Sequence, residues 1–528
     1  MSSKKITNPR SFKLAKNPEF EVMKIKTETN TFGIIKLLFS GFVILLQVVF
    51  IVLMNMYLIS LIGYYLLVSF ILSIITSIYI ISSNKNSISK ATWIFFVLIF
   101  FWFAYIIYFM ADERVFFGKS KKKYKAIFNE ANKYEVPRVE EVGGSIDVQK
   151  NCEYLKEAGN FYAYKETNLK YYSSGAQLFD DVLEELEKAT KFVFIEFFII
   201  SDGILLNKVL EILEQKIKQG VEVRLIYDDM GSHRTLSRKV KKRMKNMGIK
   251  IAVFNPLISK FSVGVNYRDH RKIIDIDGKV AFTGGINLAD EYVNEKRMYG
   301  YWKDAGLKIE GSAVNEFSII FLRQWEFIKD EKLDFAEFLN QEEKIENSSV
   351  VVPYADGLDY TQNIAKNMYA NLIANAKQKI HIMTPYFIIE DTIRDLLISK
   401  AQSGVDVKII LPDVADKRMV YQVSRSNAEK LIDYGVKIYV MKNSFVHSKI
   451  MLTESGAIVG SVNFDLRSFY QQFEIAVYTN DVGVLKAIKS DISSTIRESK
   501  QITLKNRNYN KLRYRMLAGV LRIVSPFM

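Results

Sequence analysis

The stretch from His270 to Asn287 reads HRKIIDIDGKVAFTGGIN, and the stretch from His447 to Asn463 reads HSKIMLTESGAIVGSVN. Each places a lysine two residues after its histidine and a carboxylate seven residues after it. Each then passes a turn of small residues and ends on an asparagine. The chain has four histidines, and two of them begin these stretches. Such a doubled motif predicts a repeated domain, and its side chains suit phosphodiester chemistry through a covalent histidine intermediate.

The sequence around the two stretches repeats as well. In the first half, a helical pattern from Ala176 precedes the apolar strand FVFIEFFII, and two further helix–strand pairs follow. In the second half, a helical pattern from Asn367 precedes the strand IHIMTPYFII, again followed by two helix–strand pairs. This alternation predicts two similar α/β domains, each with a mixed, mostly parallel sheet flanked by helices. We expect the two domains to form one pseudo-twofold site.

The motif spacing indicates how such a site would work. A strand places residues i and i+2 on one face, so His270 and Lys272 share a face, as do His447 and Lys449. Two such strands face to face would surround one phosphate with imidazoles and ammonium groups, to which the two asparagines add amide donors. One imidazole could attack phosphorus while the other protonates the leaving oxygen. Water as second acceptor gives hydrolysis, and a lipid hydroxyl gives transfer.

The candidate site residues fall into three groups. We include the motif carboxylates in the catalytic set, although we expect them to support the strand-to-turn geometry rather than to react. Each histidine also needs an acceptor on its second ring nitrogen, and carboxylates at the edges of downstream apolar runs are available. The catalytic set is His270, Lys272, Asp277, His447, Lys449 and Glu454, the phosphate-binding residues are Asn287 and Asn463, and the imidazole-orienting residues are Asp304 and Glu474.

The composition of the chain favours a membrane lipid as partner. Of its 528 residues 49% are hydrophobic, and no charged residue occurs from Leu37 to Asn84 or from Ala91 to Ala111. These runs leave room for two or three transmembrane helices of about 20 residues. The net charge of +15 fits nucleic acid or anionic lipid, and the apolar runs favour lipid. The lysines from Lys119 to Lys125 indicate that the catalytic domains are cytoplasmic.

The chain therefore divides into six predicted segments. They are a basic tail (1–30), a transmembrane region of two or three helices (31–111), a basic juxtamembrane linker (112–160), a first domain (161–335), a linker (336–352) and a second domain with a basic amphipathic C-terminus (353–528). That C-terminus, from Asn510, fits interfacial membrane contact and packing on the second domain equally well.

No cofactor or metal is implied by the sequence. A single cysteine, Cys152, excludes an internal disulfide framework and CxxC-type metal sites. The chain has no P-loop and no dinucleotide fingerprint, so ATP and NAD are not implied. One His-x-Lys strand is usually accidental, whereas two at equivalent places in a repeat indicate a site.

The paired motifs resemble the HxKxxxxD motifs of the phospholipase D superfamily, and the fuller pattern is similar to the bacterial cardiolipin synthase family. The similar stretches are IEFFIISDG from Ile195, YDDMGS from Tyr227, TGGINLADEY from Thr283, YWKDAGLKIEG from Tyr301, TPYFI from Thr384 and GSVNFDLRSF from Gly460. The resemblance implies transfer of a phosphatidyl group between two phosphatidylglycerol molecules, which gives cardiolipin and glycerol. It implies a phosphatidyl-histidine intermediate, with His270 as the nucleophile.

The same resemblance implies a multi-pass protein of the bacterial cell membrane that acts on phosphatidylglycerol and anionic lipid and not on nucleic acid. It leaves the oligomeric state open. The alternative is a membrane-bound phosphodiesterase of the phospholipase D type that hydrolyses phospholipid headgroups. A nuclease of the superfamily would not need the apolar segments, and two intact His-x-Lys pairs oppose a non-enzymatic membrane scaffold. Phosphatidylethanolamine or a glycolipid could also replace one phosphatidylglycerol as acceptor.

The second motif departs from the family pattern in two respects. Glu454 stands where the family has aspartate, and the interval from this carboxylate to Asn463 is one residue shorter than the interval from Asp277 to Asn287. We expect a shorter turn to compensate for the extra methylene of glutamate. Activity should therefore survive both departures.

Overall fold

The computed structural model describes most of the chain in two compact units, one within residues 13–118 and the other within residues 119–528. The described residues are parts of 42–56 and all of 59–83, 85–111, 118–134, 136, 138–139, 142–256, 267–340, 349–357, 360 and 362–527. The predicted basic tail (1–30) lies outside them.

The described part of the smaller unit includes the apolar helices α2 (Ile59–Ile81) and α3 (Ser87–Ala111). They pack against each other through a cluster that includes Ile80, Trp93 and Tyr108. Among the described residues, one helix is long and apolar enough to cross a membrane, over Leu61–Ile81. The sequence predicts two or three spans, so the described residues contain one of them.

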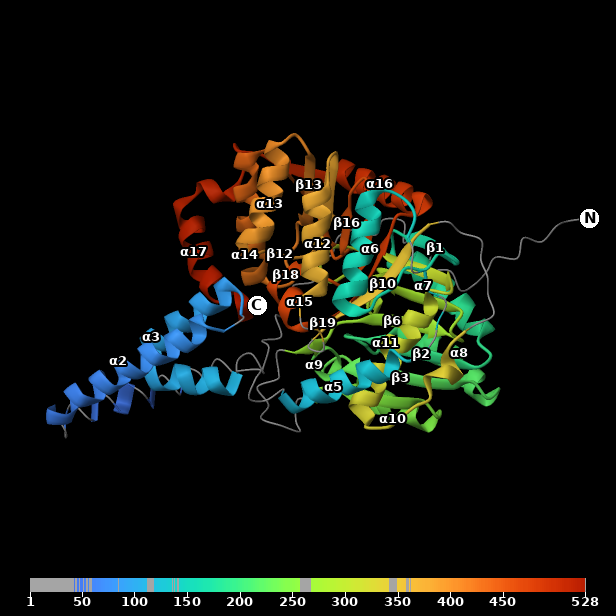
Figure 1. The fold of residues 1–528 in the computed structure, drawn as a ribbon, viewed down its shortest axis with the longest axis horizontal. Helices are drawn as coiled ribbons and strands as arrows, with labels where there is room; N and C mark the ends of the chain where they lie inside the picture. Colours follow the sequence, from blue (N-terminus) through green and yellow to red (C-terminus); the bar gives the residue numbers. More distant parts are fainter. Residues whose placement is uncertain are drawn as a thin grey trace, which may run out of the picture. The chain divides into compact units, whose positions relative to one another are not determined.

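The first α/β domain is built on a sheet with the strand order β1-β9-β7-β6-β2-β3-β4 (Figure 1). Its strands are β1 (Thr167–Tyr172), β2 (Phe192–Phe197), β3 (Glu222–Asp228), β4 (Lys250–Phe254), β6 (Lys272–Ile276), β7 (Val280–Gly284) and β9 (Gly306–Gly311). Its helices are α7 (Gly175–Lys188), α8 (Ile204–Lys218), α9 (Asp229–Ser232), α10 (Arg238–Asn246) and α11 (Val314–Lys329), preceded in the chain by α5 (Gly118–Ala131) and α6 (Ile146–Gly159). Every residue of β2 is buried, as expected for a strand covered on both faces.

The second domain has the equivalent strand order, β10-β19-β17-β16-β11-β13-β14-β20. Its strands are β10 (Val351–Asp356), β11 (Lys379–Met383), β12 (Phe387–Ile388), β13 (Asp406–Pro412), β14 (Lys437–Met441), β16 (Ile450–Leu452), β17 (Ala457–Gly460), β18 (Phe464–Asp465), β19 (Gln472–Thr479) and β20 (Ser499–Ile502). Its helices are α12 (Ile364–Asn375), α13 (Asp391–Gln402), α14 (Arg418–Lys430), α15 (Leu466–Tyr470), α16 (Val482–Arg497) and α17 (Leu512–Ile523). The first strand begins at Val351, inside the predicted linker 336–352.

The two α/β repeats are confirmed, but the prediction that their sheets are mostly parallel is wrong. Along the two strand orders given above, only the pairs β2–β3 and β3–β4, and likewise β11–β13 and β13–β14, are parallel among the described strands. Each of these pairs is joined through a helix, which parallel strands require. The strands that carry the motifs follow one another through tight turns, so β6–β7 and β16–β17 are antiparallel.

Three short strands join the two domains. The strand β5 (Arg268–Asp269) of the first domain pairs in parallel with the start of β19 in the second. In the opposite sense, β15 (Ser444–Val446) of the second domain pairs in parallel with β8 (Tyr301–Lys303) of the first. Each of these pairs lies directly before a motif histidine.

Candidate active site

The inter-domain strand pairs set each motif histidine opposite a carboxylate of the other domain. In the first pair Asp269 lies opposite Phe473, so the next residues are His270 and Glu474. In the second pair Val446 lies opposite Lys303, and His447 and Asp304 come next. The histidines thus lie in the connections before β6 and β16, not within the strands as the sequence analysis expects.

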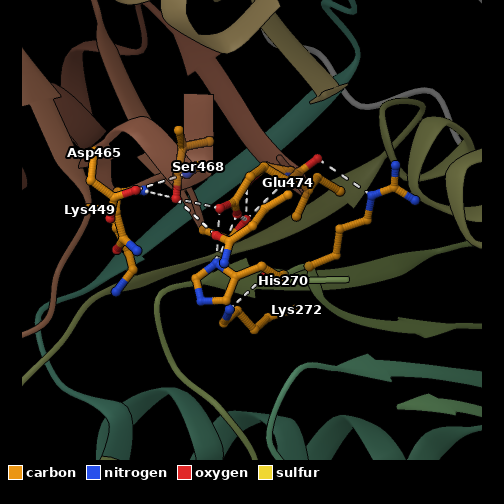
Figure 2. A network of polar contacts seen from close by, with 12 residues as sticks. His270, Lys272, Lys449, Asp465, Ser468 and Glu474 are labelled. Carbon is orange, nitrogen blue, oxygen red and sulfur yellow. Dashed lines mark hydrogen bonds and ion pairs between the residues drawn. The ribbon is translucent and has the colours of Figure 1, made fainter. Parts of the chain in front are cut away.

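His270 is held by Glu474. The ring Nδ1 lies 3.0 Å from both carboxylate oxygens. Ser468 donates to the same carboxylate at 2.7 Å, and Ser461 donates to it as well. In Figure 2 the carboxylate lies between Ser468 and the imidazole ring. A carboxylate that accepts from Nδ1 leaves Nε2 of His270 unprotonated and available for attack.

His447 is held in the same way by Asp304, whose Oδ2 lies 2.7 Å from the ring Nδ1. Asp304 is fully buried, and its other oxygen accepts from the backbone N–H of Ala305 at 2.8 Å. Gly285 leaves the space for this carboxylate, because a Cβ there would lie 2.1 Å from Oδ1 of Asp304. The structure places the predicted imidazole-orienting residues, Asp304 and Glu474, against the two rings, and each carboxylate lies against the histidine of the other domain.

Each motif lysine contacts the histidine of its own motif. Nζ of Lys272 donates to the backbone carbonyl of His270, and Nζ of Lys449 donates to that of His447. Nζ of Lys449 also lies 2.8 Å from Nδ1 of His447. That nitrogen cannot accept from lysine while it donates to Asp304. We assign its proton to the bond with Asp304, because a bare Nδ1 facing a carboxylate would be repelled.

Burial lowers the pKa values of the cations in this site. It lowers the pKa of His447 to about 4 and that of His270 well below its usual range, helped in each case by the neighbouring lysines. It lowers the pKa of Lys272 to about 7 and that of Lys449 to about 8, against the attraction of nearby carboxylates. Burial also raises the pKa of Glu474 to about 8. A bound phosphate would reverse these effects on the cations, because it supplies the missing negative charge.

Asn287 and Asn463, the predicted phosphate-binding residues, both line the cavity between the histidines. The amide of Asn287 is engaged with the protein, since Oδ1 accepts from the N–H of Ile199 at 3.1 Å and Nδ2 donates to the Tyr292 hydroxyl at 2.7 Å. Among the described residues, Oδ1 of Asn463 has no hydrogen-bond partner. This oxygen is an acceptor, so it cannot itself bind a phosphate oxygen, and only the NH2 group of Asn463 could donate to one.

The motif carboxylates do not line the cavity, which corrects their inclusion in the catalytic set. Both oxygens of Asp277 accept from the chain at the start of β2, from the backbone N–H groups of Thr190, Lys191 and Phe192 at 2.7–2.8 Å. Glu454 accepts in the same way from Lys377 and Lys379, at the start of β11. Both carboxylates connect a hairpin turn to the neighbouring strand, β2 or β11.

The expected shortening of the second turn is also wrong. In the first copy Ile276 pairs with Val280, whereas in the second Leu452 pairs with Ala457, so the second turn is one residue longer. The interval from Glu454 to Asn463 is shorter because the strand after the turn is shorter, since β7 has five residues and β17 has four. Asp277 begins its turn with a φ of 57°, a conformation that Glu454 does not adopt. Glutamate instead reaches its backbone partners from the second position of a wider turn.

A cavity of about 270 Å³ lies between the two domains, with both histidines in its wall. Its lining outside the predicted set includes Glu291, Tyr292, Asp416, Lys417, Asp465 and Arg467. Four of these fall within the stretches TGGINLADEY and NFDLRSF, whose resemblance to a family is the signal that could identify them. Asp416 and Lys417 follow β13 in a segment without a motif, so the sequence offers no signal for them.

The fold and the site define the class of protein, a tandem phospholipase D-like protein with one histidine pair between its two domains. The family described as "Cardiolipin synthase, PLD-like domain" matches residues 182–321 and 369–496, about half of the chain. The chain belongs to this family.

Similar proteins agree with this assignment. An uncharacterized protein of Streptococcus mutans is 36% identical over 85% of this chain and 99% of its own length. A cardiolipin synthase of Halalkalibacterium halodurans is 32% identical over 85% of this chain and 91% of its own, and a probable cardiolipin synthase of Bacillus subtilis is 31% identical over 83% and 88%. The crystal structure of phosphatidylserine synthase from Haemophilus influenzae has the same fold, with a TM-score of 0.56 at 14% identity over 72% of this chain and 99% of that one.

Proposed function

We propose that the chain is a cardiolipin synthase that transfers a phosphatidyl group from one phosphatidylglycerol to another and releases glycerol. The observation that carries the proposal is the crossed pairing of His270 with Glu474 and of His447 with Asp304 around one cavity. Each carboxylate accepts from Nδ1 of its imidazole, which leaves Nε2 of that ring for attack or for proton transfer. The names of the relatives agree with the activity.

In the first step, Nε2 of His270 attacks the phosphorus of the donor lipid. The bond from phosphorus to the glycerol headgroup oxygen breaks, and His447 in its protonated form gives that oxygen a proton. The products are free glycerol and a phosphatidyl group bonded to His270. The ammonium groups of Lys272 and Lys449 would stabilise the negative charge on the phosphoryl oxygens in the transition state.

In the second step, His447 acts as the base. It takes the proton from a glycerol hydroxyl of a second phosphatidylglycerol, and that oxygen forms a bond to phosphorus as the bond to His270 breaks. Cardiolipin leaves, and both histidines return to their starting state. Water in place of the lipid hydroxyl would give phosphatidic acid, which is the alternative, hydrolytic function.

The lining of the cavity favours transfer to a lipid. Besides the polar residues, the wall carries apolar and aromatic side chains on both sides of the histidines, from both domains. They include Met298, Tyr299, Tyr386, Ile388, Val420 and Phe445. Such a wall suits the glycerol backbone and the first methylenes of a lipid, and a bound lipid would displace water from the intermediate.

We propose further that the protein spans the bacterial cell membrane two or three times within residues 31–111, with the catalytic domains in the cytoplasm. The helix over Leu61–Ile81 supports one of these spans. The lysines of α5, which follow the apolar region, support the orientation by the positive-inside rule. A first domain at 161–335 belongs to the same proposal, and the second domain begins at Val351 with β10 rather than at residue 353.

The purified protein in phosphatidylglycerol vesicles, without nucleotide or added metal, tests the function. We expect cardiolipin and free glycerol in equal amounts, and no product from His270→Ala or His447→Ala. Phosphatidic acid as the sole lipid product would overturn the synthase in favour of the hydrolase. Full activity of both alanine variants would overturn the mechanism.

A further inference from the structure

The C-terminal helix α17 presents an apolar surface on the side that faces away from the protein. Tyr514, Ala518 and Leu521 form the inward side, and Tyr514 donates a hydrogen bond to the carbonyl of Gln422 on α14 at 3.2 Å. One helical turn apart on the outward side lie Leu512, Met516 and Val520, which are 62%, 64% and 62% exposed. A helix in contact with water carries polar residues on this side, so the apolar stripe requires another explanation.

The segment of the chain that contains the stripe carries only positive charge. From Ser499 to Met528 the chain has seven basic residues and no acidic one. Arg507 and Arg522 are engaged with Asp433 and Asp391, whereas Arg513 and Arg515 of α17 are exposed beside the apolar stripe. An apolar face with exposed arginines beside it is the pattern of a helix that lies in the headgroup region of an anionic bilayer.

The residues that follow α17, and the start of the helix α14 on which it packs, line the cavity. It runs antiparallel to α14, because Tyr509 contacts Glu429 near the end of α14 and Tyr514 contacts Gln422 nearer its start (Figure 1). The chain after α17 forms a 3-10 turn at Ser525–Phe527 that packs on α15, and Ser525 lines the cavity. On α14, Met419 is 53% exposed, and its neighbours Lys417 and Val420 line the cavity.

We propose that α17, with Met419 of α14, docks on the surface of an anionic phospholipid bilayer and holds the cavity mouth against it. This inference rests on the proposed function for the identity of the substrate and adds to it how the lipid arrives. A lipid would then pass from the bilayer into the cavity along a short path whose walls are apolar for its acyl chains and basic for its headgroup. The occupant is lipid rather than another protein surface, because the exposed arginines beside the stripe would lose their hydration in a protein interface without a partner charge.

A fluorescent probe at Met516→Cys in the full chain tests the docking. The native Cys152 is buried, and burial raises the pKa of its thiol to about 12, so it will not react with the maleimide dye. The matched control is Lys242→Cys on α10, a helix with six basic residues against three in α17 and without an exposed large apolar side chain. Both labelled proteins are reconstituted in phosphatidylglycerol vesicles that contain phospholipid with brominated acyl chains.

We expect bromine to quench the probe at position 516 at least about fivefold more than the probe at position 242, and high salt to reduce the difference. Equal quenching at the two positions would overturn the proposal. An emission shifted to the blue without quenching by bromine would also overturn it, because a protein surface, in this chain or in a second copy, would then cover the helix.

The variant Met516→Glu/Val520→Glu separates docking from chemistry. We expect its turnover of phosphatidylglycerol in vesicles to fall about tenfold, with unchanged turnover of a short-chain phosphatidylglycerol dissolved as monomers. Equal activity of variant and wild type on vesicles would overturn the docking. Quenching at position 516 in a protein that forms no cardiolipin would leave the docking intact and reject the proposed function.

Discussion

At the scale of single residues, the two halves of the site differ in the residue that lies against the carboxylate beside each histidine. Gly285 in the first copy and Ser461 in the second occupy equivalent places after the motif strands. The Ser461 hydroxyl donates to Glu474, whereas any side chain at position 285 would occupy the space of Asp304. The glycine of the first copy is thus a steric requirement, and the serine of the second is a hydrogen-bonding one.

Gly285→Ala should therefore displace Asp304 and release His447. We expect turnover to fall about 100-fold or more, since a histidine that loses its orienting carboxylate no longer holds the productive tautomer. Ser461→Gly is the matched variant, and we expect a loss of about tenfold because Ser468 still donates to Glu474. Turnover in vesicles and the thermal midpoint in detergent are measured for both. A fully active Gly285→Ala protein would contradict the role of Asp304.

The buried state of His447 predicts a pH dependence of stability. Burial lowers the folded-state pKa of His447 to about 4, below its usual value of about 6.5. Between these values the unfolded chain binds a proton that the folded chain does not, so this contribution to stability is lost as the pH falls. The free-energy difference between wild type and His447→Asn should fall by about 2 kcal/mol between pH 7.5 and pH 4.5. Unfolding in detergent at both pH values measures it, and a constant difference would contradict a neutral His447.

At the scale of elements, the sequence predicts the helices and strands that are long enough to show a periodic pattern of apolar residues. The helix and strand repeats on both sides of Phe192 and of Ile380 are long enough to show their pattern, and the structure confirms them. The strands β5, β8 and β15 have two or three residues each, which is too short for any period. These strands create the crossed pairing of histidine and carboxylate, so the central feature of the site could not be read from the sequence.

The turn carboxylates Asp277 and Glu454 make similar contacts from two hairpin turns of different length. Asp277 accepts four hydrogen bonds, from three backbone N–H groups and the Thr190 hydroxyl, whereas Glu454 accepts from Lys377 and Lys379. Both fasten the hairpin of the motif to the strand beside it. The loss of either should therefore affect folding more than chemistry.

Asp277→Asn tests this role, because asparagine tolerates the left-handed conformation of the turn but faces N–H donors with its own NH2 group. We expect the free energy of unfolding to fall by about 2 kcal/mol, with turnover at 20 °C within about threefold of wild type. Glu454→Gln should cost about 1 kcal/mol, since fewer bonds are affected. A variant of normal stability without activity would instead return Asp277 to the catalytic residues.

At the scale of the whole molecule, the two domains share one interior. Leu307 and Ile309 of the first sheet belong to the same buried cluster as Val459 and Ile475 of the second. The buried amine of Lys303 reaches Asp491 of the second domain at 2.7 Å. A hydrophobic interface of this kind, closed by buried polar contacts, does not open and close like a hinge. The two half-sites are therefore held permanently together within one chain.

A mixture of two inactive variants tests this conclusion. Because β5 with β19 and β15 with β8 bring both histidines of a site from a single chain, His270→Ala and His447→Ala reconstituted together should have only the sum of their separate activities, below about 1% of wild type. The control is wild type mixed in equal amount with either variant. Its activity per total protein should be half that of wild type alone. Recovery to about a quarter of wild-type activity in the mixture of variants would show that copies exchange domains, since one site in each mixed pair would then contain both histidines.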